Sequence, residues 1–99
     1  MANVKDKNPC IVHDGIEVHV GIEDFDDFRI TECLGSIMDD SVTDAEKAVS
    51  IVRLTKTVLK GDYERVQGEL RERGGGRLTN QAMLDFVFGL MREAGAKNS

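Results

Sequence analysis

The sequence has no tryptophan, a single proline and only five aromatic residues, four Phe and one Tyr, in 99 positions. It also lacks any run near the roughly 18 apolar residues that a membrane helix needs, and its first ten letters, MANVKDKNPC, lack the apolar core of a signal peptide. We therefore expect no membrane segment and a cytoplasmic location, with Cys10 and Cys33 as free thiols in a reducing compartment. The 40% hydrophobic and 31% charged residues are typical of one small, soluble, largely helical domain.

An excess of positive charge is missing as well. The net charge is -5, and it is unevenly distributed: residues 1–42 hold 3 Lys/Arg against 10 Asp/Glu, whereas residues 43–99 hold 10 against 8. Because phosphate binding needs a basic face, this pattern argues against nucleic acid as the main partner. It leaves open a basic protein partner, or self-association that brings the acidic front of one copy to the basic back of another.

The glycine-rich stretch RERGGGRLT lacks the features of a phosphate-binding loop. A Walker loop needs Gly-x-x-x-x-Gly-Lys-Ser/Thr between a strand and a helix, whereas Gly74, Gly75 and Gly76 follow a predicted helix and precede no Lys-Ser/Thr pair. We expect Gly74 to end that helix and the other two glycines to give slack, forming a hinge before the last helix. If the last helix swings on this hinge, alanine at Gly75 and Gly76 should impair assembly more than stability.

Four residues could in principle bind zinc: Cys10, His13, His19 and Cys33. In a regular hairpin Cys10 and His13 lie on opposite faces, and Cys33 falls on the apolar stripe of its helix. Buried thiols and surface histidines therefore explain these residues better than a metal site.

The acidic segments Glu23–Asp27 and Asp39–Ser41 do not have the spacing of a calcium-binding EF-hand loop, so helix capping and solvation explain them better. Residues for acid–base or nucleophilic catalysis exist, but no local signature places them together. We expect no catalytic residue, no cofactor and no metal, and hence a protein that is not an enzyme.

Residues 10–22 predict a β-hairpin. Two β-branched runs, Cys10–Val12 and Ile16–Val20, flank Asp14-Gly15, which supplies the positive φ angles of a tight turn. The alternation from Ile16 to Ile22 indicates one apolar face. Since two strands are marginal in water, that face must lie on helices or on another copy of the hairpin.

The rest of the chain predicts about four helices, each with apolar residues at helical spacing. These residues are Ile30, Cys33, Leu34, Ile37 and Met38; then Ala48, Ile51, Val52, Thr55, Val58 and Leu59; then Tyr63, Val66 and Leu70; and finally Met83, Phe86, Val87, Leu90, Met91 and Ala94. The first helix is expected to follow the capping carboxylates Asp24, Asp26 and Asp27. The second should begin at a Thr43–Glu46 capping box and end at Gly61 in a left-handed conformation, and the third should begin at Asp62. Thr79 should cap the fourth, with Leu78 and Met83 as a hydrophobic staple. We expect a mainly α (α+β) domain over residues 10–95, with flexible ends at 1–9 and 96–99.

A small prophage-type DNA-binding regulator is an alternative, because the middle of the chain is rich in basic residues. These are Arg53, Lys56, Lys60, Arg65, Arg71, Arg73 and Arg77. Four acids are interleaved with them, and such mixed signs on a helix are more typical of ion pairs and solubility than of a DNA-reading helix.

The order of three segments resembles the tail assembly chaperones of long-tailed phages and prophages. The segments are DDFRITECLGSIMDD, AVSIVRLTKTVLKGDYERVQGELRERGG and GRLTNQAMLDFVFGLMREAG, and the resemblance covers roughly residues 24–95. Its closest points are the Gly61–Arg65 joint and the Gly-Arg-Leu-Thr stretch that leads into the last helix.

This resemblance implies a non-enzymatic protein that coats the tape-measure protein, keeps it soluble and delivers it to the tail-tube protein. Such proteins work in the host cytoplasm and do not remain in the virion, and their genes commonly make a longer frameshifted product. The family has no fixed contact motif, so no residue role carries over.

A chaperone for a long apolar helix should offer apolar side chains at helical spacing together with charges of both signs. Five residues are the candidates for such a partner-binding surface, and the alternative for each is ordinary core packing. They are Phe25, Phe28, Leu84, Phe88 and Met91.

Overall fold

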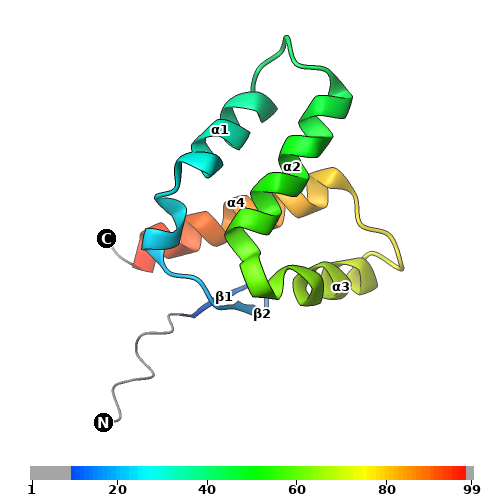
Figure 1. Ribbon diagram of the computed structural model, residues 1–99. Helices are drawn as coiled ribbons and strands as arrows, with labels where there is room; N and C mark the ends of the chain where they lie inside the picture. Colours follow the sequence, from blue (N-terminus) through cyan, green and yellow to red (C-terminus); the bar gives the residue numbers. More distant parts are fainter. Residues whose placement is uncertain (1–9, 98–99) are drawn as a thin grey trace.

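The computed structural model describes residues 10–97, so the predicted flexible end at residues 1–9, and residues 98–99 of the one predicted at 96–99, lie outside the described part of the chain. The elements follow one another as β1 (Ile11–His13), β2 (Ile16–Val18), the 3-10 turn η2 (Ile22–Phe25), α1 (Phe28–Ile37), α2 (Asp44–Leu59), the 3-10 turn η3 (Lys60–Asp62), α3 (Tyr63–Arg73) and α4 (Asn80–Lys97) (Figure 1). The predicted mainly helical domain with an N-terminal antiparallel hairpin is confirmed. Helix α4 extends to Lys97, beyond residue 95 where the expected domain ends.

The hairpin forms where the sequence predicts it. β1 and β2 pair antiparallel, with Ile11 opposite Val18. Asp14 and Gly15 connect them with φ angles of 56° and 79°, as a two-residue turn of this handedness requires.

One face of the hairpin is buried, and it ends earlier than the alternation of the sequence indicates. Ile16, Val18 and Val20 are at most 1% exposed, as predicted, whereas Ile22 is 41% exposed. Ile22 begins the turn η2, where the two-residue period of a strand no longer sets the direction of the side chain.

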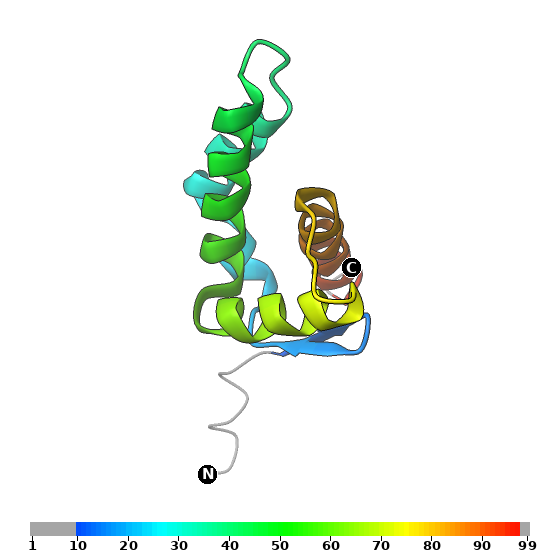
Figure 2. The ribbon, with the colours of Figure 1, turned by 90° about the vertical axis from the view of Figure 1, so that its right-hand side faces the viewer.

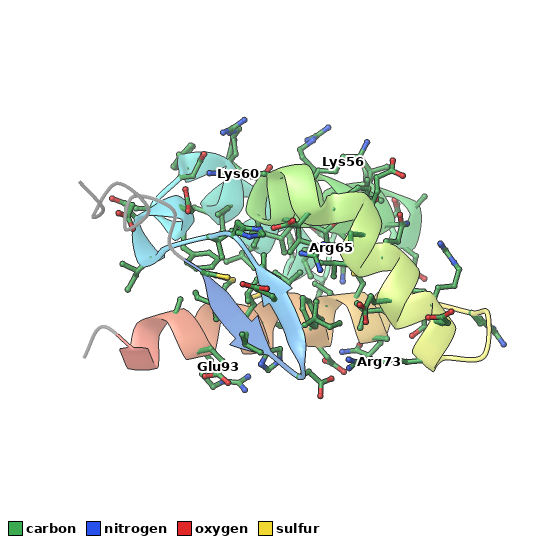
Figure 3. All side chains as sticks on the ribbon, turned by 90° about the horizontal axis from the view of Figure 1, so that it is seen from below. Lys56, Lys60, Arg65, Arg73 and Glu93 are labelled. Atoms are coloured by element: carbon green, nitrogen blue, oxygen red, sulfur yellow. The ribbon has the colours of Figure 1, made fainter. Side chains whose placement is uncertain are left out.

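Helices α3 and α4 cover this hairpin. Arg65 and Arg73 reach from α3 to the strands, where Arg65 donates to the Glu17 carbonyl and Arg73 Nη1 donates to the Asp14 carbonyl at 2.7 Å (Figure 3). α4 packs on β1, and the apolar face of the hairpin joins a core to which α1, α2, α3 and α4 contribute.

Helix α4 approaches the hairpin most closely at Gly89. A Cβ atom at Gly89 would lie 2.2 Å from His13 Nε2, so only glycine leaves room for the imidazole there. The His13 ring is half-buried and lies 5.3 Å from the Phe86 ring centre. The expectation that both histidines lie on the surface is therefore wrong for His13, because it points toward α4 on the core side of the hairpin.

Helices α1 and α2 form an antiparallel pair with clear caps. Asp27 accepts the Arg29 N–H at 2.9 Å at the start of α1, and the Thr43–Glu46 capping box before α2 is present in both directions. Both caps are as the sequence predicts. Met38, expected on the stripe of α1, follows the end of that helix and is 76% exposed.

The core face of α2 differs from the predicted stripe. Leu54 is fully buried, whereas Val52, which the prediction placed in the core, is 44% exposed. Ile51, Leu54 and Val58 follow the i, i+3, i+7 spacing equally well, so the sequence permitted two overlapping stripes on this helix. Packing against α4 selects the stripe that contains Leu54.

Helices α2 and α3 are one bent segment, since η3 joins them without a loop. The residue with a positive φ is Lys60, at 50°, and not the expected Gly61. The bend directs Asp62, the predicted start of α3, toward the hairpin, where its carboxylate accepts the backbone N–H of His19 at 2.8 Å.

The three glycines end α3 with a defined hydrogen-bonded cap. The Gly76 N–H donates to the Arg71 carbonyl at 2.8 Å, and the Gly75 N–H donates to the Glu72 carbonyl at 3.1 Å, which is the Schellman pattern. Gly75 and Gly76 have φ angles of 71° and 98°. The glycines, expected to be a flexible connection, thus form a hydrogen-bonded turn. Thr79 then caps α4, as predicted, by accepting the Ala82 N–H.

The arrangement places the two ends of the domain in different surroundings. The hairpin, α3 and α4 pack together at one end, while the α1–α2 pair projects away from them and its connecting loop lies at the far end (Figure 2). The pair therefore presents much of its surface to solvent.

We expect Gly89→Ala to lower the free energy of unfolding by about 1 to 3 kcal/mol, because the added methyl group overlaps the His13 ring. The matched control is Gly68→Ala in α3, where a Cβ meets nothing within 4 Å and alanine should raise stability by about 0.5 to 1 kcal/mol. Urea denaturation gives both values.

A double-mutant cycle tests whether the contact with His13 causes the loss of stability in Gly89→Ala. In a His13→Ala background, Gly89→Ala should lose its cost. Equal effects of Gly89→Ala in the two backgrounds would show that the contact with His13 does not determine the choice of glycine.

Candidate interaction surface

Two valines of α2 face solvent on one side of the projecting helical pair. Val49 is 55% exposed and Val52 is 44% exposed. They are three residues apart, so they lie next to each other on the helix surface. Apolar side chains at this spacing are what a partner helix would contact.

These valines belong to a shallow groove along α1 and α2, which we call the α1–α2 groove. Three adjoining hollows of about 150, 260 and 350 Å³ make up the groove, and each shares residues with the next. Its residues are Arg29, Glu32, Cys33, Ser36, Val42, Glu46, Val49, Ser50, Val52, Arg53 and Lys56.

Basic residues border the apolar part of this groove. Arg53 lines all three hollows and forms no ion pair with any residue between 10 and 97. Lys56 lies 5.6 Å from the centre of the Tyr63 ring, a cation–π arrangement. Arg29 binds Asp27 at 2.6 Å at the other end. An apolar strip next to an unpaired guanidinium fits an acidic amphipathic helix.

The floor of the groove is polar but satisfied. Ser50, 7% exposed, donates from its hydroxyl to that of Ser36 at 2.9 Å. Cys33 beside them is 3% exposed, and burial raises the pKa of its thiol, although Arg53 opposes this effect. The thiol therefore stays protonated at neutral pH and packs as a core residue, as the sequence predicts.

The five candidate partner-binding residues do not form one exposed surface. Phe28 is 72% exposed at the start of α1, whereas Leu84 is 8% exposed and belongs to the core. The other three, Phe25, Phe88 and Met91, are half-buried against the core. Leu84 would be accessible only if α4 moved, and Phe28 is the one member of the set that is largely exposed.

The sequence did not single out Val49 and Val52. Val52 lay within the predicted core stripe, and Val49 alone gives no signal. The sequence signal for an exposed apolar residue was the presence of two overlapping apolar stripes on α2, because a helix that buries one stripe must expose the other.

The triglycine joint borders a hollow of about 660 Å³ between the hairpin turn, the end of α3 and the start of α4. Arg73 crosses it to the Asp14 carboxylate at 3.5 Å. The N–H groups of Gly74, Gly75 and Gly76 are bound by carbonyls of α3, so they do not offer the free amides of a phosphate cradle.

A swing of α4 about the three glycines stays a prediction, and it would have to break the Gly76–Arg71 hydrogen bond. The positive φ of Gly75 and of Gly76 means that alanine at either position costs about 1 kcal/mol of stability by itself. Assembly of the Gly75→Ala, Gly76→Ala variant must therefore be compared with that of the wild-type protein at a temperature where both are fully folded. If the variant assembles as well as the wild-type protein at that temperature, the glycines serve only to cap α3 and not as a hinge.

The four residues considered for zinc lie in three different places. His13 faces α4 and Cys33 lies in the α1–α2 pair, whereas Cys10 and His19 lie together with Glu17 on the outer face of the hairpin. One ligand atom from each of these three lies within 4.8 Å of those of the other two.

No protein-family model, no curated protein and no solved structure matches this chain. Among the helices described, none is both long enough and apolar enough to cross a membrane.

We expect the Asp27–Arg29 pair to stabilise the domain in a pH-dependent way. The hydrogen bonds from Arg29 lower the pKa of the Asp27 carboxyl from 3.8 to about 2. A folded-state pKa below the unfolded value gives stability that is present above about pH 4 and is lost as the pH falls toward 2. Asp27→Asn keeps the capping oxygen but not the charge, so it should be less stable than the wild-type protein at pH 6 and nearly equal to it near pH 2.

Urea denaturation between pH 6 and pH 2.5 measures this difference. Asp26→Asn is the control, because the Asp26 carboxylate forms no ion pair with the described residues. A wild-type advantage over Asp27→Asn that stays constant across this range would rule out the charged pair as its cause.

Proposed function

We propose that this protein is a non-enzymatic tail assembly chaperone of a long-tailed phage or prophage, which binds the tape-measure protein, self-associates along it and promotes assembly of the tail tube. The observation that carries the proposal is the α1–α2 groove, with Val49 and Val52 exposed beside Arg53 and Lys56. The resemblance of residues 24–95 to such chaperones supplies the identity of the partner.

The groove suits a long helical partner for two physical reasons. The valines repeat at helical spacing, so an amphipathic helix can lay its apolar side chains between them. The neighbouring cations favour acidic residues on that helix and keep the complex hydrated. The projection of the α1–α2 pair leaves this face accessible along its length (Figure 2).

The structure gives less support to the alternative of a DNA-binding regulator. Lys60, Arg65 and Arg73 each contact a carboxylate, at 2.6, 3.0 and 3.5 Å respectively. Arg65 and Arg73 also hold the hairpin. Cations used in this way are not free to neutralise phosphates, so α3 does not offer the row of basic side chains that a DNA backbone requires.

Co-expression tests the proposal. The protein should keep soluble a helical fragment of the tape-measure protein from the phage or prophage that encodes it. The Val49→Asp, Val52→Asp variant should bind this fragment about tenfold or more weakly, since two carboxylates would enter an apolar contact beside acidic partner residues. The readouts are the soluble fraction of the fragment and its dissociation constant.

The matched control is Val12→Asp, the same substitution at a valine that is 56% exposed on the hairpin. It should bind the fragment as the wild-type protein does. A fragment that stays insoluble with the wild-type protein would refute the chaperone proposal. Tight, salt-sensitive binding of duplex DNA would favour the regulator instead.

A further inference from the structure

The outer face of the hairpin carries a cluster of three chemically different side chains. Val12 of β1 lies opposite Glu17 of β2. Cys10 lies two residues before Val12 and His19 two residues after Glu17, both just outside the paired strands. Strand geometry therefore turns Cys10, Glu17 and His19 toward the same side. Cys10 Sγ donates to Glu17 Oε2 at 2.8 Å, and the ligand atoms of all three residues lie within 4.8 Å of one another.

A fourth residue fixes the histidine. The Asp62 carboxylate accepts the His19 backbone N–H at 2.8 Å and lies 3.1 Å from His19 Nδ1. Because an ionised carboxylate only accepts, Nδ1 carries the proton of this pair, and the lone pair of the neutral ring is on Nε2. This carboxylate–histidine arrangement is the one that orients metal-binding histidines.

Asp62 is itself held in place. Its side chain is only 14% exposed, and Arg65 binds its Oδ1 at 3.0 Å while also donating to the Glu17 carbonyl. Arg65 therefore neutralises Asp62 and ties β2 to α3. Figure 3 shows Arg65 between α3 and the hairpin.

We propose that Cys10, Glu17 and His19 bind a zinc ion, with Asp62 as the positioning residue and water in the fourth position. Thiolate sulfur, imidazole nitrogen and carboxylate oxygen are the ligands that Zn²⁺ takes in proteins. Tetrahedral bonds of about 2.0 to 2.3 Å place ligand atoms roughly 3.3 to 3.8 Å apart. The Cys10–Glu17 pair, at 2.8 Å, would therefore open by roughly 0.5 to 1 Å, and any pair near the 4.8 Å limit would close by about 1 Å. The Cys10 thiol proton leaves to solvent as the Zn–S bond forms.

The ion would act as a clamp. It would join the start of β1 to the end of β2 and, through His19 and Asp62, to the bend between α2 and α3. A hairpin with three residues in each strand has few hydrogen bonds of its own, so a metal that binds only the folded form stabilises it by mass action.

The test uses the full chain, purified without metal. Zn²⁺ should bind at one equivalent, and zinc at one hundred times its dissociation constant should raise Tm by about 10 °C. Co²⁺ as a probe should give an intense near-ultraviolet charge-transfer band from the thiolate and the visible bands of a tetrahedral ion. No binding, or Co²⁺ bands without thiolate charge transfer, would overturn the proposal.

Variants assign the ligands. Cys10→Ser should remove the charge-transfer band, and His19→Gln and Glu17→Gln should each weaken Zn²⁺ binding at least tenfold. Asp62→Asn should weaken it about 10- to 100-fold and still give the band at saturation, as expected for a positioning residue.

Cys33→Ala and His13→Ala are the matched controls and should bind as the wild-type protein does. Circular dichroism of each metal-free variant separates loss of ligand from loss of fold. Loss of the band in folded Cys33→Ala, or its survival in folded Cys10→Ser, would refute the assignment.

Discussion

The need to cover the hairpin is the constraint on which the rest of this domain depends. β1 and β2 contribute three residues each, too few to be stable in water, and one face carries Ile11, Ile16 and Val18. Helix α4 closes on this face, which the absence of a side chain at Gly89 allows. Two arginines of α3 then hold the strands by their carbonyls.

This covering explains why the candidate interaction surface lies elsewhere. The apolar face of the hairpin joins a core with residues of α2, α3 and α4, and Ile30 and Cys33 extend the same core into α1. The α1–α2 pair is stabilised mainly by contacts between its own two helices and by their caps. Its outer side exposes Val49 and Val52 beside Lys56, which lies over the Tyr63 ring, and Arg53, which forms no ion pair with the described residues.

The bend at η3 affects both the α1–α2 pair and the hairpin. It turns the chain from the projecting pair to the hairpin, and it places Asp62 where a carboxylate can hold His19. The hairpin is thus tied to α3 by Asp62, Arg65 and Arg73. The sequence predicted that the charged residues of this region form a solvated helix face, whereas Asp62, Arg65 and Arg73 form hydrogen bonds between α3 and the hairpin.

The sequence by itself determined the features that depend on neighbours in the chain. The Asp14-Gly15 turn, the Thr43–Glu46 capping box and the Thr79 cap involve residues at most three apart, so their geometry follows from local backbone chemistry. The same holds for the end of α3 at the glycines, although their hydrogen bonds showed order where slack was expected.

Only the tertiary structure decided which apolar residues face the core and which side chains meet. Val52 and Leu54 both fit a helical stripe, and the position of α4 buries one and exposes the other. The contacts of His13 with Gly89 and of His19 with Asp62 join residues far apart in the sequence. No local pattern encodes them, because the partners are 43 residues apart for His19 and Asp62 and 76 residues apart (89 − 13) for His13 and Gly89.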